Sequence, residues 1–319
     1  MVEFPPFAPA IAQALADEDR RIVITGAGGW LGLATLDLLA GALGADAVEK
    51  RVRCFGASDR VLRLCDGTPI LQRPLADLAW LPNEPTLVLH TAFLTKDRAE
   101  AMNEGEYRAA NAAISQTVLR ALTPIGADAV FVASSGAAAK ADDPAASPAM
   151  RLYGAMKRDD EALFAQWAQD TGKAAVIARL YALAGPRINK PGAYALASFA
   201  LDALAGRPIA VRAPRAVVRA YAPIREVMSL VFALMLRGGG VTRFDSGGTP
   251  MELADVAAII ADLVPGGRVD RAPITDPASD IYHGDGDAYA ALLAAHGIAP
   301  VPLADAFAET MNSLAGYQP

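Results

Sequence analysis

Short apolar runs alternate with longer helical patterns through the first half of the chain. Runs of this kind, with little polar alternation, are typical of strands that are buried on both faces of a sheet. The expected strands are Arg21–Thr25, Val52–Phe55, Thr86–His90, Ala129–Ala133 and Ala174–Leu180, and the expected helices are Trp30–Ala40, Tyr107–Leu122 and Met150–Thr171. Strands separated by helices predict an α/β fold with a doubly wound parallel sheet.

The pattern changes after Leu180. Glycine and proline become frequent, and two shorter helices, Tyr194–Ala205 and Glu226–Leu236, alternate with short extended pieces. We therefore expect a first domain over residues 1–180 and a smaller, mixed α/β substrate domain over residues 181–319. A strand expected at Arg243–Asp245 is the one later segment that could return to the first sheet.

Composition supports a folded protein of about two domains, given 319 residues and 53% hydrophobic residues. Such a chain can bury a large core, which excludes a disordered protein. The net charge is −6 and no basic stripe offsets it, so we expect no nucleic-acid partner. Two cysteines, Cys54 and Cys65, are too few for a disulfide scaffold.

The first 20 residues do not have the pattern of a secretory signal. They are acidic at the start and interrupted by proline, whereas a signal needs a basic segment followed by a continuous apolar run. The chain also has no uninterrupted apolar run of about 18 residues, the length that spans a membrane. We expect a cytoplasmic protein without a membrane partner. His283 and His296 lack the spacing of metal ligands, so no metal is expected.

Glycines recur at every third position between the first strand and the first helix. Gly26, Gly29 and Gly32 can provide a tight turn, close approach of a pyrophosphate and close packing of the helix on the strand. The helix that begins at Trp30 and Leu31 would direct backbone N–H groups at the phosphates. The position of the turn predicts the dinucleotide site of a Rossmann fold. The alternative is a tight turn with no ligand.

The residues after the second expected strand indicate which dinucleotide is bound. An acidic residue at this strand tip would bind the ribose hydroxyls of NAD. Here the tip is followed by Ser58 and Arg60, a pair that suits the 2′-phosphate of NADP. We therefore expect NADP, and Asp59 keeps NAD possible. Arg60 could instead be an ordinary solvated charge.

Tyr153 and Lys157 are spaced to share one face of a helix. A free phenol has a pKa of about 10, and a nearby ammonium group lowers it toward the range of a working acid/base. Lys157 can also reach a nicotinamide ribose. Ser134 and Ser135 close the strand upstream, where a hydroxyl can bind a carbonyl or alcohol oxygen. Together these residues predict a proton-transfer site for hydride chemistry.

These motifs and their order resemble a known family, the extended short-chain dehydrogenases/reductases of the NAD(P)-dependent epimerase/dehydratase kind. The resemblance covers most of the chain and is clearest through residue 187. The segments that carry it are TGAGGWLG at 25–32, LVLHTAF at 87–93, YRAANAAISQTVLRA at 107–121, FVASSGAAAK at 131–140, YGAMK at 153–157, ARLYALAGPR at 178–187 and VRAYAPIREV at 218–227.

The resemblance implies roles for the residues of the expected active site. Tyr153 would be the acid/base, Lys157 its partner and Ser135 the catalytic serine that also contacts the substrate. Asn111 would support the proton relay or the geometry of the site.

The resemblance also implies residues that bind the ligands. His90, Thr91 and Ala92 would line the cofactor, and Arg219 would bind the diphosphate of an anionic substrate, a nucleotide sugar. A homodimer would form through the helices at Tyr107–Leu122 and Met150–Thr171.

Departures from the family pattern keep other functions open. Gly136-Ala137 stands where the family's dehydratases have an Asp-Glu pair, so elimination is not expected. Ala182 replaces an asparagine of the family's substrate site. We expect an NAD(P)-dependent epimerase or reductase that transfers hydride at a sugar carbon. The alternatives are an NADPH-dependent reductase of a ketone or aldehyde without a nucleotide, and a non-catalytic regulator that senses NADP.

Overall fold

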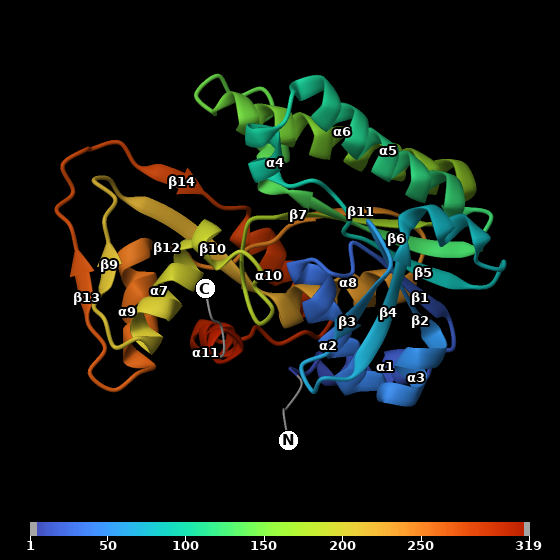
Figure 1. The fold of residues 1–319 in the computed structure, drawn as a ribbon, viewed down its shortest axis with the longest axis horizontal. Helices are drawn as coiled ribbons and strands as arrows, with labels where there is room; N and C mark the ends of the chain where they lie inside the picture. Colours follow the sequence, from blue (N-terminus) through green and yellow to red (C-terminus); the bar gives the residue numbers. More distant parts are fainter. Residues whose placement is uncertain (1–4, 316–319) are drawn as a thin grey trace. The chain divides into compact units, whose positions relative to one another are not determined.

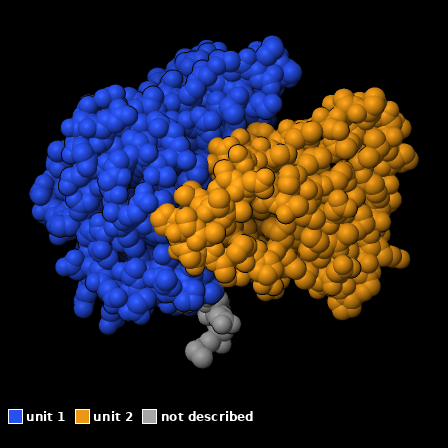
Figure 2. All heavy atoms as spheres, turned by 180° about the vertical axis from the view of Figure 1, so that it is seen from behind, with its two compact units in different colours: residues 1–180, 228–244 blue, residues 181–227, 245–319 orange. Residues whose placement is uncertain are grey.

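The computed structural model describes residues 5–315, and the chain divides into two compact units (Figure 2). Of the described residues, the first unit comprises 5–180 and 228–244, and the second comprises 181–227 and 245–315. Residues 228–242 thus belong to the first unit, although we had expected them in the second domain. The reason is packing: the Ser229 hydroxyl accepts a hydrogen bond from Ala8 N at 2.9 Å, and Phe232 packs edge-on against Phe7.

Eight strands of the described residues form the sheet of the first unit. Their order across the sheet is β11-β7-β6-β5-β1-β2-β4-β3. The strands are β1 (Arg21–Thr25), β2 (Val52–Gly56), β3 (Arg60–Arg63), β4 (Pro69–Pro74), β5 (Thr86–His90), β6 (Ala127–Ser135), β7 (Ala174–Leu180) and β11 (Gly240–Asp245).

The pairing of these strands explains their composition. Neighbours from β4 to β7 run parallel, and β1 and β5 at the centre of the sheet are buried at every residue. Such strands are apolar throughout because both faces are covered. At the outer edge, β3 pairs antiparallel with β4 and is mostly exposed. The predicted α/β class with a Rossmann-type sheet is confirmed.

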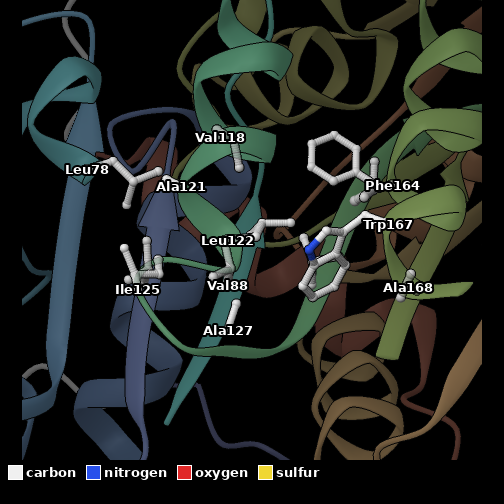
Figure 3. Packing of buried hydrophobic residues seen from close by; sticks show 14 of the residues in the cluster. Leu78, Val88, Val118, Ala121, Leu122, Ile125, Ala127, Phe164, Trp167 and Ala168 are labelled. Atoms are coloured by element: carbon white, nitrogen blue, oxygen red, sulfur yellow. The ribbon is translucent and has the colours of Figure 1, made fainter. Parts of the chain in front are cut away.

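Two long helices, α5 (Glu104–Leu122) and α6 (Pro148–Thr171), cover one face of this sheet (Figure 1). Val118 and Leu122 of α5 meet Phe164 and Trp167 of α6 in one buried cluster above the strands (Figure 3). The same cluster includes Val88 of β5. This core fixes the position of α6, the helix that carries the expected Tyr and Lys.

The other face is covered by helices that come from both ends of the unit (Figure 1). They are α1 (Pro9–Ala16), α2 (Trp30–Leu43) and α8 (Ile224–Arg237), with α3 (Ala45–Arg51) beside them. The loop after β5 leads into a short helix, α4 (Lys96–Ala101). Among residues 5–315, none of the helices has the length and apolarity that crossing a bilayer requires.

The second unit is less regular, as the glycine and proline content predicts. Its strand β10 (Val217–Pro223) pairs with three short strands, and a separate pair of short strands lies beside the helices. The short strands are β8 (Ala182–Ala184), β12 (Pro250–Glu252) and β14 (Asp280–Tyr282), then the pair β9 (Ile209–Val211) and β13 (Val269–Arg271); the helices are α7 (Ala195–Leu204), α9 (Leu253–Asp262), α10 (Gly286–Ala295) and α11 (Leu303–Leu314).

Candidate active site

The glycine turn joins β1 to α2 and is held on two sides. Gly26 N donates a hydrogen bond to Phe55 O at 2.8 Å, and Gly26 has a φ of +70°. A side chain at Gly26 would bring its Cβ within 2.6 Å of Ala92 N, so the turn presses against the segment after β5. Likewise, a Cβ at Gly32 would lie 2.6 Å from Ala27 O. Only glycine fits these two positions.

The N-terminus of α2 has the features of an anion site. Gly29 is the N-cap, and no side chain caps this end of the helix. Helix α2 begins at Trp30 and Leu31, and the first backbone N–H groups of a helix point out along its axis. A pyrophosphate suits such a turn, because the N–H groups and the helix dipole both favour negative charge. The residues present therefore fit the dinucleotide that the sequence predicts.

The structure brings Arg60 to the glycine turn. A Cβ at Gly28 would lie 2.6 Å from Arg60 Nη2, so the guanidinium covers the turn. Gln72, which pairs with Arg60 in the β3–β4 hairpin, donates a hydrogen bond to Ser58 O at 2.9 Å. The segment after β2 thus places the positively charged side chain of Arg60 at the glycine turn. Gln72 was missed at the sequence level, because only the pairing of β3 with β4 reveals it.

The residues after β5 also lie against the turn. Thr91 Oγ1 donates a hydrogen bond to Thr25 O at 2.6 Å. His90 Nδ1 lies 2.9 Å from Thr25 Oγ1, and its ring packs on Phe164 with 5.0 Å between the ring centroids. Burial, and then the charge of Lys157, lower the pKa of His90 to about 3, so the imidazole is neutral. His90 supports the turn through Thr25, and the residue as a whole is only 3% exposed.

Tyr153 and Lys157 lie together on α6, as their spacing predicts. Lys157 Nζ is 5.9 Å from the centroid of the Tyr153 ring and donates a hydrogen bond to Ala133 O at 2.8 Å. Burial lowers the pKa of Lys157 to about 8, while the charges of Asp160 and Glu161 oppose that shift. Lys157 is therefore mainly protonated at neutral pH and presents a buried positive charge beside the phenol.

Gly154 allows α6 to approach the turn that follows β6. This turn, η2 (Gly136–Lys140), begins at Ser135, whose Oγ accepts a hydrogen bond from Ala137 N at 3.2 Å. A Cβ on Gly154 would overlap Ala137 O. The absence of a side chain at Gly154 therefore sets how closely its neighbour Tyr153 approaches the turn that begins at Ser135.

A buried carboxylate, which the sequence analysis missed, joins α6 to β6 and β7. Glu161 accepts a hydrogen bond from Ser134 Oγ at 2.5 Å and two from Arg179, both at 2.8 Å. Its position four residues after Lys157 on the same helix face was the signal that could have revealed it. The network fixes the end of β6 one residue before Ser135.

Asn111 is fully buried on α5, and its amide group is bound to backbone atoms. Its Oδ1 accepts a hydrogen bond from Leu94 N at 2.8 Å, and its Nδ2 donates one to Tyr107 O at 3.3 Å. Tyr107 Oη in turn donates to Leu94 O at 2.7 Å. Asn111 thus ties the segment after β5 to α5, and its role in the active site stays a prediction.

Phe93 is a further residue that the sequence analysis missed. Its ring centroid lies 3.6 Å from Lys157 Nζ, and the ring meets Tyr153 edge-on at 5.8 Å between centroids. One aromatic side chain thus touches both members of the Tyr-Lys pair. Nothing in the spacing of the sequence signals this contact, because it joins the loop after β5 to α6.

Arg219 belongs to the second unit and is described within it. It lies on β10, where its Nη2 forms an ion pair with Asp280 Oδ2 at 2.9 Å. Its Nη1 donates hydrogen bonds to Val218 O and Asp280 O, both at 2.9 Å. The guanidinium therefore already has an acidic partner from β14, and an anionic ligand would have to compete with that partner.

A cleft of about 580 Å³ opens at the sheet edge of the first unit. Val48, Cys54, Leu71 and Trp80 are among its lining residues, but no residue of the glycine turn or of α6 lines it. Among residues 5–315, no group of three or more His, Cys, Asp and Glu side chains is arranged to hold a metal ion.

Comparison with solved structures reveals the same fold. One similar structure is UDP-glucose 4-epimerase from Thermus thermophilus in complex with NAD, with 21% identity, a TM-score of 0.63 and coverage of 93% of this chain and 99% of that one. Another is UDP-N-acetylglucosamine 4-epimerase from Methanobrevibacter ruminantium in complex with UDP-N-acetylmuramic acid, with 18% identity, a TM-score of 0.69 and coverage of 93% and 98%. MoeE5 in complex with UDP-glucuronic acid and NAD has 19% identity, a TM-score of 0.66 and coverage of 92% and 98%.

A search of curated protein sequences found no significant match. The model of the NAD dependent epimerase/dehydratase family matches residues 22–243, which include the glycine turn, the Tyr-Lys pair and most of β11. This match covers more than half of the chain. The protein therefore belongs to the NAD dependent epimerase/dehydratase family of enzymes, as its motifs predict.

Proposed function

We propose that this protein is an NADP(H)-dependent epimerase or reductase that transfers hydride at a sugar carbon of a nucleotide-activated sugar. The observation that carries the proposal is the pairing of Tyr153 with a buried, protonated Lys157 on α6. Ala133 O binds Lys157 only two residues before Ser135. This arrangement suits proton transfer to or from a substrate oxygen. A homodimer, as the resemblance implies, and a cytoplasmic location complete the proposal.

In the proposed mechanism, residues of this chain bind and orient the ligands and move a proton. A bound nicotinamide would supply or accept the hydride. The glycine turn and the N-terminus of α2 would hold the pyrophosphate of the dinucleotide. Ser135 Oγ donates a hydrogen bond to the substrate oxygen, and Tyr153 Oη gives or takes the proton at that same oxygen. The positive charge of Lys157 stabilises the phenolate form of Tyr153 and so lowers the cost of that transfer.

The substrate class rests on the similar structures and on Arg219. The similar structures bind UDP-glucuronic acid and UDP-N-acetylmuramic acid in their complexes. An arginine binds phosphate oxygens with two parallel hydrogen bonds, and we propose that Arg219 binds a diphosphate in this way.

The purified protein should convert or bind at least one UDP- or dTDP-sugar in a panel assayed with NADPH and with NAD⁺. Chromatography of the sugar products would detect the epimer, and the absorbance of NADPH would detect reduction. The dinucleotide alone serves as the control. If calorimetry finds NADPH binding but none for any nucleotide sugar, the substrate class is wrong.

A second candidate function is the reduction of a ketone or aldehyde that carries no nucleotide. The ion pair between Arg219 and Asp280 favours it, because Asp280 occupies the guanidinium that would bind a diphosphate. An Arg219→Ala variant distinguishes the two candidates. Its activity should fall steeply if a diphosphate binds there, and should stay unchanged if the substrate lacks one.

Arg60 carries the proposed preference for NADP. We expect Arg60→Ala to raise the KM for NADPH by roughly ten- to a hundredfold, because a charge-assisted bond to the 2′-phosphate is lost. The KM for NADH should stay within about twofold, since NADH has no such phosphate. Initial rates with both dinucleotides measure the two constants.

Arg63 provides a matched control for Arg60, because it lies on the same strand and donates a hydrogen bond to Gly67 O. Arg63→Ala should leave both KM values unchanged. An Arg60→Ala variant with an unchanged ratio of the two KM values would contradict the NADP assignment and favour NAD.

A further inference from the structure

The ring of Phe93 covers the ammonium group of Lys157. With 3.6 Å between Lys157 Nζ and the ring centroid, no other atom fits between them. On another side, Nζ donates its hydrogen bond to Ala133 O. Lys157 is only 5% exposed, so the ring and the protein interior leave it little open surface. A hydroxyl group that is to bind Nζ on the side of Phe93 must first displace the ring.

The backbone on either side of Phe93 is fixed, which limits how the ring can leave. Thr91 N and Thr91 Oγ1 both donate hydrogen bonds to Thr25 O, at 3.2 and 2.6 Å. Leu94 N and Leu94 O are bound by Asn111 and Tyr107 on α5, at 2.8 and 2.7 Å. The backbone segment therefore stays in place while the Phe93 side chain turns about its own bonds. Rotamer changes of side chains that are not fully buried are fast.

We propose that Phe93 is a positioning residue that caps Lys157 in the free protein and turns away when the nicotinamide ribose binds. This inference rests on the proposed function, since it assumes that a nicotinamide dinucleotide occupies the site. Phe93 holds Tyr153 and Lys157 side by side before binding, through its edge-on contact with one and its face-on contact with the other.

The cap has a cost that binding must overcome. A buried cation–π contact stabilises the capped form, and the free energy lost with that contact opposes binding of the nicotinamide ribose. When the competent form is only a fraction of the molecules, the apparent affinity falls by that fraction. Removing the ring should therefore tighten binding of any ligand that reaches Lys157, and should not affect a ligand that reaches only the glycine turn.

Isothermal titration of two ligands on the wild type and on Phe93→Ala tests this directly, without turnover. NADPH carries the nicotinamide ribose, whereas adenosine 2′,5′-bisphosphate carries only the adenosine half. We expect Phe93→Ala to lower the Kd of NADPH by about tenfold and to leave the Kd of the bisphosphate unchanged. Phe93→Leu, which keeps apolar volume but has no π face, should give a smaller decrease. This second variant also covers the case in which Phe93→Ala does not fold.

The outcomes separate the inference from the proposed function. If the wild type binds neither NADPH nor NADH, the proposed function fails. If NADPH binds and both Phe93 variants bind it equally well or more weakly than the wild type, the capping role is wrong and the proposed function stands. A decrease in Kd by the same factor for both ligands also overturns the inference, because a general loosening of the site would cause it. Trp80→Ala, at an exposed aromatic residue outside the glycine turn and α6, is the control for loss of an aromatic ring.

Discussion

A Tyr153→Phe variant is expected to lose turnover by about 10²–10⁴-fold while it keeps its fold and its dinucleotide affinity. The substitution removes only Oη, the atom that we propose moves the proton. The ring remains, and with it the edge-on contact with Phe93, whose centroids are 5.8 Å apart. Steady-state rates on the converted nucleotide sugar measure the loss, and NADPH titration and a thermal melt measure what is retained.

The same variant distinguishes an enzyme from a sensor. A regulator that only binds NADP has no need of a phenolic proton, so in cells a sensor would keep its phenotype with Phe at position 153. Membership of an enzyme family argues for the catalytic role. Full turnover by Tyr153→Phe would remove Tyr153 as the acid/base. The next residue to test would then be Ser135, the other hydroxyl expected at the substrate oxygen.

A Gly154→Ala variant is expected to have a free energy of unfolding lower by about 1–3 kcal/mol and to lose most of its activity. The added Cβ would overlap the carbonyl oxygen of Ala137, which is backbone and cannot turn aside. Helix α6 must therefore shift away from η2, and Tyr153 and Lys157 shift with it. A displacement of a catalytic group by about 1 Å can cost about a hundredfold in rate.

Denaturant unfolding and initial rates measure both effects of Gly154→Ala. Gly192 supplies the control, since a Cβ there meets nothing within 4 Å and its φ is not in the left-handed range. Gly192→Ala should change neither stability nor rate. Equal behaviour of the two variants would show that the close approach of α6 to η2 does not position the Tyr-Lys pair.

The strands of the central sheet were predictable because burial on both faces makes them continuously apolar. The predicted bounds of β1, β5 and β7 coincide with the observed ones. The short strands of the second unit were not assigned, since β8, β9, β12, β13 and β14 have three residues each and no periodicity can develop over that length. Pairing with β10 or with each other, rather than local sequence, makes these segments extended.

The residues of the candidate site likewise fall into those that local sequence predicts and those that only tertiary packing reveals. Tyr153 and Lys157 were predictable because a spacing of four residues on a helix fixes their geometry. Phe93 and Gln72 were not, since each reaches the site through tertiary packing. Phe93 depends on the fixed loop after β5, and Gln72 depends on the register that pairs it with Arg60. Glu161 was predictable from the sequence, because it continues the face of α6 that carries Lys157.

If Arg60 selects the dinucleotide as proposed, the hairpin of β3 and β4 separates that selection from the proposed proton transfer. Arg60 and Gln72 both belong to this hairpin, and β3 is the outermost strand of the sheet. The proposed proton-transfer residues belong to β6 and α6, and the buried cluster that packs α6 on the sheet contains no residue of the hairpin. Exchange of the hairpin for one with an acidic residue at position 60 would therefore be a modular change. A lineage, or an engineer, could move this enzyme between the cell's reducing and oxidising dinucleotide pools without rebuilding its catalytic centre.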